Sequence, residues 1–119
     1  MYLVIDTEAA QTSTFFQELL QLDGREYLFR FLWLHRSSQW LLNIYDQDEN
    51  PLALGIGLKI NWPLLHRFQD PRLPPGLLMA IDKSGKDLDV ADPTDLGVRV
   101  ILMYTTEDDE DFQPGGLLA

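Results

Sequence analysis

The chain has 119 residues, the size of one domain with its own core. Its 19 acidic and 9 basic residues give a net charge of −10, which argues against binding to nucleic acid or to an anionic membrane, since both attract lysine and arginine. The lack of cysteine excludes disulfides, zinc–thiolate sites and thiol chemistry, and leaves the redox compartment open.

Short apolar segments separated by turn residues predict an all-β protein. The first expected strands are residues 2–6, 14–22 and 25–35. Asp23 and Gly24 lie between the last two and predict a two-residue hairpin turn, because both turn positions need positive φ. Further strands are expected at residues 40–46, 52–60, 76–82 and 98–105. Residues 61–68 are predicted to form one short helix, with Asn61 as its cap and Pro63 in its first turn.

Six or seven strands predict a mainly β domain over residues 1–106, as a small barrel or a sandwich, and periodicity does not distinguish the two. Residues 107–119 begin with Glu-Asp-Asp-Glu-Asp and are expected to form a flexible acidic tail. The tail either keeps the protein in solution or docks on a basic surface. The first residues lack a signal-peptide pattern, and no stretch has the roughly 20 apolar residues of a membrane span. We therefore expect a soluble protein that is made and used without export.

The expected strand 25–35 is apolar on both faces. Tyr27, Phe29, Phe31 and Trp33 point to one side, and the other side carries leucines interrupted by Arg30. A strand in a one-sided sheet alternates apolar with polar residues. The second face must therefore be covered, either by the rest of a closed barrel or by another subunit.

Motifs that carry chemistry are weak in this sequence. Asp46-Gln-Asp-Glu-Asn resembles the opening of a calcium loop, but the loop's required glycine and glutamate are replaced by Pro51 and Gly57, so we expect a hairpin turn. His35 and His66 lack companions at ligand spacing, so no metal site is expected. Aspartates between residues 82 and 95 leave a carboxylate-pair hydrolase as a minor hypothesis. We expect no catalytic residues and no cofactor.

Five segments, in order, resemble a known family. They are Leu22-Asp-Gly-Arg-Glu-Tyr-Leu-Phe-Arg-Phe, Arg36-Ser-Ser-Gln-Trp-Leu-Leu-Asn-Ile-Tyr-Asp, Asn50-Pro-Leu with a glycine-spaced strand, Leu73-Pro-Pro-Gly-Leu-Leu-Met-Ala-Ile-Asp and Asp95-Leu-Gly-Val-Arg-Val-Ile-Leu-Met-Tyr. Their order and spacing are similar to the baseplate plug family of small contractile-tailed phages, first associated with cyanophages. The family commonly has a glycine near Asn61 and a second glycine near Pro75, where this chain differs, and the acidic tail is a further departure.

The resemblance implies a non-enzymatic virion component, assembled in the host cytoplasm and placed in the tail baseplate. It implies a position beside the hub and the end of the tube, where the protein helps to close or join the central channel. The implied partners are other baseplate proteins in a symmetric, multi-copy assembly, with no need for nucleic-acid contact and no membrane.

Aromatic residues are the candidates for the core or for an interface: Phe29, Phe31, Trp33, Trp40 and Tyr45. Arg30 either extends its charged group to the rim or forms a paired charge inside an interface. A second hypothesis is a small acidic module that occupies a basic protein surface.

Overall fold

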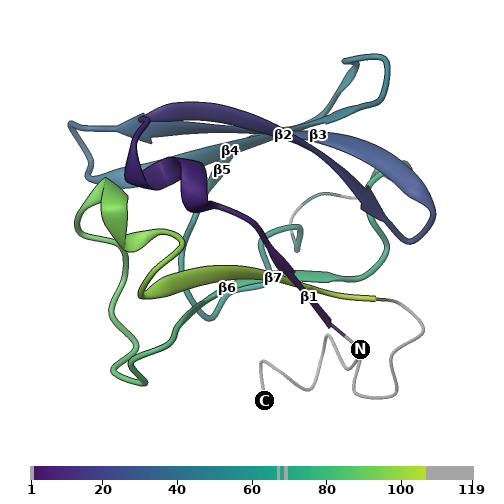
Figure 1. Cartoon of the computed structure of the whole chain (residues 1–119). Coiled ribbons are helices and arrows are strands. Elements are labelled where there is room, and N and C mark those ends of the chain that lie inside the picture. The colour runs from purple at the N-terminus through teal and green to yellow at the C-terminus, as the bar shows by residue number, and fades with distance from the viewer. Residues whose placement is uncertain (1, 67, 69, 107–119) are drawn as a thin grey trace.

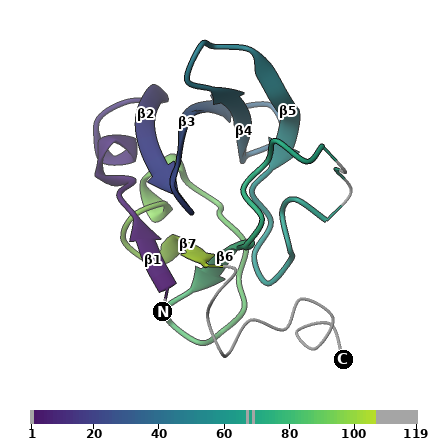
Figure 2. The same cartoon turned by 90° about the vertical axis from the view of Figure 1, so that its right-hand side faces the viewer.

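A computed structural model describes residues 2–66, 68 and 70–106, and these form two antiparallel sheets. The first sheet has the order β1 (Tyr2–Ile5), β7 (Val100–Thr105), β6 (Leu77–Asp82). The second has the order β2 (Phe15–Leu22), β3 (Arg25–Leu34), β4 (Gln39–Asp46), β5 (Pro51–Gly57). The sheets lie one above the other as a sandwich that does not close into a barrel (Figures 1 and 2).

The predicted hairpin at Asp23-Gly24 is confirmed, with Leu22 paired to Arg25 on either side of it. Asp23 and Gly24 have φ values of 49° and 82°, as a turn of this kind requires. From there β2 and β3 pair without interruption as far as Phe15 and Leu32. The turn therefore fixes which residues of β2 and β3 share a face.

The predicted helix at residues 61–68 is wrong. Asn61 has a φ of 58°, so it does not begin a helix, and its side-chain amide donates to Asp87 at 2.9 Å. The backbone amides of Asn61 and Leu64 donate to Ala80 and Leu78 of β6, at 2.8 and 2.9 Å. Inside the segment, the amides of His66 and Phe68 donate to the carbonyls of Pro63 and Leu65, both at 3.1 Å, which makes turns rather than a helix.

Two 3-10 helices lie between the expected strands. η1 (Glu8–Gln11) follows β1, and η2 (Pro93–Asp95) precedes β7. The side-chain amide of Gln11 donates to the carbonyls of Thr94 and Leu96, both at 2.8 Å, so η1 and η2 lie side by side at one end of the sandwich (Figure 1). Asp92 caps η2 by accepting from the backbone amide of Thr94.

The core lies between the two sheets and is built on aromatic rings. The rings of Phe16 and Phe31 stack with centroids 4.6 Å apart, and Trp40 packs edge-on against Phe16 at 5.4 Å and Trp33 at 5.6 Å. The indole N–H of Trp40 donates to the carbonyl of Pro93 at 3.1 Å, so burial leaves no unpaired donor on that ring. Tyr27 shares this inward face, as the alternation along β3 predicts.

Candidate interaction surfaces

The four-stranded sheet has an outer face, which lies away from the other sheet (Figure 2). An apolar patch covers part of this face. Two rows of cross-strand neighbours form it. The first is Phe15, Leu32 and Leu41; the second is Leu19, Leu28 and Tyr45. We call these six residues, with Arg30 between the rows, the outer patch. Phe15, Leu19 and Leu32 are 52%, 63% and 37% exposed.

Arg30 links the outer patch to its surroundings. Its Nε donates to Oε1 of Gln17 at 3.2 Å, and its Nη2 pairs with Oε1 of Glu49 at 3.5 Å. The guanidinium lies over the ring of Tyr45, 4.6 Å from the centroid. A flat cation stacked on an aromatic ring is largely stripped of water on one side and is well suited to contact with another protein.

The structure separates the six interface candidates into two groups. Phe29, Phe31 and Trp40 are fully buried and belong to the interior of this chain, and the partly buried Trp33 packs against the same core. Arg30 and Tyr45 lie on the outer patch. Phe15 and Leu19 are not among the predicted interface residues, although the register set by Asp23-Gly24 places both beside the outward leucines of β3.

The three-stranded sheet also has an apolar outer face. Val4 is 56% exposed and lies beside Met103, which pairs in turn with Met79. Ile81 and Ile101 form the next row and are half-buried. Both outer faces of the sandwich are therefore rich in apolar side chains, whereas the charged residues of the described chain concentrate at turns and loops.

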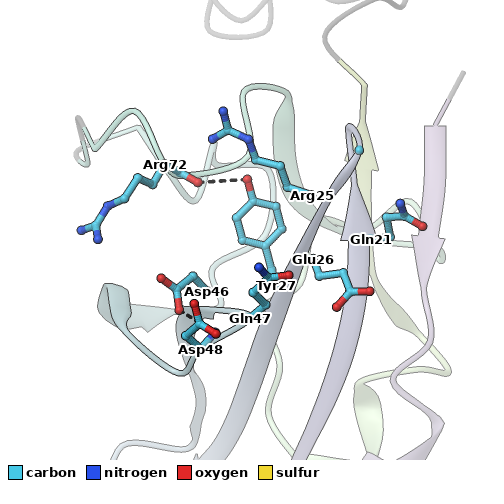
Figure 3. A pocket seen from close by; sticks show the side chains of 9 residues that line it. Gln21, Arg25, Glu26, Tyr27, Asp46, Gln47, Asp48 and Arg72 are labelled. Carbon is cyan, nitrogen blue, oxygen red and sulfur yellow. Dashed lines mark hydrogen bonds between the residues drawn. The ribbon is translucent and has the colours of Figure 1, made fainter.

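A cavity of about 470 Å³ opens where the β2–β3 turn, the β4–β5 turn and the segment around Arg72 meet (Figure 3). The hydroxyl of Tyr27 donates to the carbonyl of Arg72 at 2.9 Å, and Arg72 is paired with Asp70 at 2.7 Å. Asp46 accepts from the amides of Asp48 and Asn50 at 2.9 and 2.8 Å. These bonds hold the walls of the cavity in place and confirm that residues 46–50 form a turn.

The aspartates of the 82–95 segment hold a loop together rather than forming a catalytic pair. Oδ2 of Asp82 pairs with Arg99 at 3.0 Å, and Oδ2 of Asp95 pairs with the same guanidinium at 3.3 Å. Burial raises the pKa of Asp82, but hydrogen bonds from the amides of Leu88 and Ser84, together with Arg99, outweigh it and bring the pKa to about 2. A general acid for glycoside hydrolysis needs a raised pKa. The geometry does not favour the hydrolase hypothesis.

Within residues 2–66, 68 and 70–106, no three His, Asp or Glu side chains come together as a metal site. No helix in that part of the chain is long and apolar enough to cross a membrane. The acidic tail predicted at residues 107–119 lies outside the described residues.

A β-sandwich with apolar side chains on both outer faces is typical of a protein that assembles with others. The chain belongs to the family described as the cyanophage baseplate Pam3 plug gp18, whose family model matches residues 2–107. That match covers all seven strands of the described structure, and it confirms the resemblance drawn from the sequence. It gives the chain a structural role in a phage tail baseplate. No curated protein matches the chain.

Proposed function

We propose that the chain attaches to the central hub and the end of the tail tube, and closes or joins the channel between them. The family supports a place in the baseplate. The outer patch supports attachment through one face of the four-stranded sheet. The proposal includes several copies in a symmetric arrangement. Symmetric assemblies form when every copy repeats the same contact.

The single observation that carries the proposal is the composition of the outer patch. It combines exposed Phe15, Leu19 and Leu32 with an arginine stacked on Tyr45. Interface centres are enriched in aromatic residues and arginine, and burial of such side chains contributes most of the binding energy. Removal of apolar surface from water contributes about 25 cal/mol per Å², and the affinity is what is left after the entropy and desolvation costs of association.

The test is co-expression of the full chain with the hub and tube proteins of the same virus, followed by size-exclusion chromatography with light scattering. Wild type should form a complex that survives 1 M salt, where the Debye length is about 3 Å. The double variant Leu19→Gln/Leu32→Gln should bind at least about tenfold more weakly. Leu88→Gln is the matched control, since Leu88 is 52% exposed on a distant loop.

Three results would speak against the proposal. A monomer that ignores both proteins would overturn it. Equal binding by the double variant and the control would move the contact away from the outer patch. A complex that dissociates at 1 M salt would favour the acidic binding module instead, because salt screens binding that is driven by net charge.

A further inference from the structure

The sandwich has four edge strands, and three of them are protected against pairing with another chain. β1 has only four residues. β5 begins with Pro51 and its register with β4 shifts. β6 is covered along its open side, where Ile60 forms a parallel bridge with Ala80. Short length, proline, irregular pairing and cover are the usual ways in which proteins blunt a sheet edge.

The fourth edge, β2, lacks these four protections, and the one charged side chain on it, Glu18, points inward, which discourages pairing with any strand that does not neutralise it. β2 is eight residues long, pairs with β3 without a bulge, and contains neither proline nor lysine. In the described part of the chain, β3 is the only strand that pairs with it. Phe15 and Leu19 on its outer face are also among the most exposed apolar side chains. An edge of this kind is a template for a further strand.

The backbone groups that β2 offers can be named. The amide of Trp33 donates to the carbonyl of Thr14 at 2.8 Å, so even-numbered residues of β2 bond to β3. The odd-numbered residues therefore point their backbone to the open side. At Phe15 both backbone groups are already bonded to the hydroxyl of Ser13, which accepts from the amide at 3.3 Å and donates to the carbonyl at 2.6 Å. Gln17, Leu19 and Gln21 are left to pair with an incoming strand.

Glu18 shows what chemistry the incoming strand must carry. Its side chain points inward, since it pairs in register with the fully buried Phe29. Its Oε2 is buried and has no hydrogen-bond partner, and the negative charge of Asp6 lies near enough to disfavour ionisation. A buried carboxylate oxygen without a partner is costly, and a cationic donor beside it would offset that cost.

We propose that an extended segment of a neighbouring baseplate protein adds to the open edge of β2 as a fifth strand, with lysine or arginine opposite Glu18 and an apolar residue opposite Leu19. The cation enters the seam between the sheets, and the apolar residue extends the outer patch. This inference rests on the proposed function for the identity of the neighbour. A second copy of this chain fits poorly, because pairing two β2 strands would gather the Glu18 and Asp6 carboxylates of both copies at one edge.

The experiment is hydrogen–deuterium exchange of the full chain, alone and with the purified hub or tube protein, read at single amides. The amides of Gln17, Leu19 and Gln21 should gain protection on binding, while Glu18 and Leu20, already bonded to β3, should change less. Glu18→Lys should weaken binding by about tenfold or more. Glu26→Lys, an exposed charge reversal on β3, should stay within about twofold of wild type.

A complex that forms without protecting these three amides would overturn the inference and leave the proposed function standing. If neither protein binds, the proposed function fails, and the edge is tested with a second probe. That probe is a synthetic peptide of alternating valine and threonine with one central lysine. Its control is the same peptide with glutamate in place of the lysine, and binding is read from the amide chemical shifts of this chain. Shifts at β2 with the lysine peptide only would support the inference, and equal or absent shifts would overturn it.

Discussion

The hydroxyl of Tyr104 donates a hydrogen bond to the carboxylate of Asp23 and accepts one from the amide of Gly76 at 2.6 Å. Tyr104 belongs to β7 in one sheet, and Asp23 forms the turn between β2 and β3 in the other. A Cβ on Gly76 would lie 2.1 Å from the carbonyl oxygen of Thr105, so only glycine allows this approach. One buried tyrosine thus ties the two layers together beneath the hairpin that carries the outer patch.

Tyr104→Phe should therefore lower the free energy of unfolding by about 1–3 kcal/mol, because it leaves the Gly76 amide and the Asp23 carboxylate without this partner. Urea denaturation followed by tryptophan fluorescence measures the change. Tyr45→Phe is the control, since it keeps the ring beneath Arg30 on the surface, and it should change the free energy by less than about 0.5 kcal/mol. Equal effects of the two variants would contradict the assigned role of Tyr104.

Glu18 gives the stability a pH dependence. Burial, and then the charge of Asp6, raise its pKa from 4.5 to about 7. The folded state therefore holds this proton more tightly than the unfolded chain, and stability falls as the pH rises from 4.5 to about 7. Glu18→Gln should be more stable than wild type at pH 8 by about 1 kcal/mol, a value reduced for the partial exposure of Glu18, and equal to it at pH 4.

Urea denaturation at both pH values tests this behaviour, with the exposed substitution Glu26→Gln as control. The difference between wild type and Glu18→Gln should grow between the two pH values, and that between wild type and Glu26→Gln should not. A difference for Glu18→Gln that is the same at pH 4 and pH 8 would show that its carboxylate is not destabilised by burial.

Arg99 holds the loop between β6 and β7. Its guanidinium donates to the carbonyls of Leu88 and Asp89 at 2.7 and 2.8 Å and pairs with Asp82 and Asp95. Lysine keeps the charge but cannot reach four acceptors at once. Arg99→Lys should speed amide exchange in residues 83–98 by about tenfold, whereas the exposed substitution Arg36→Lys should leave that segment unchanged. Unaltered exchange in Arg99→Lys would mean that other contacts hold the loop.

A substitution at Arg30 should affect binding more than stability. Because its contacts lie at the surface, Arg30→Lys should change the free energy of unfolding by less than about 1 kcal/mol. The same variant should bind the hub or tube protein several-fold more weakly, since lysine does not present a flat cation stacked on Tyr45. Calorimetric titration measures the affinity, with Arg36→Lys as control. Unchanged affinity for Arg30→Lys would place this residue outside the interface.

The sequence predicts much of this fold because turn chemistry is local. Asp23-Gly24 fixes one hairpin and its register, and alternating apolar runs locate the other strands. The sequence predicts less where hydrogen bonds to a distant strand determine the local conformation. Residues 61–68 carry helix signals at Asn61 and Pro63, yet the amides of Asn61 and Leu64 bond to Ala80 and Leu78 of β6, a later strand.

The outer patch is harder to predict from the sequence than the fold. Both faces of β3 are apolar, so β3 alone cannot show that Phe29 and Phe31 point inward. That choice depends on β2 and β4, whose inward residues Phe16 and Trp40 complete the aromatic core. The unpartnered oxygen of Glu18 is a consequence of packing between the sheets, and no sequence pattern indicates it.

The most direct test of the central claim is photo-crosslinking in assembled tails. A photo-reactive amino acid placed at position 19 reports from the outer patch, and the same group at position 88 reports from a distant exposed loop. Mass spectrometry then identifies the proteins joined to each position. The account predicts hub or tube adducts from position 19 and few from position 88. Adducts from position 88 with none from position 19 would contradict it.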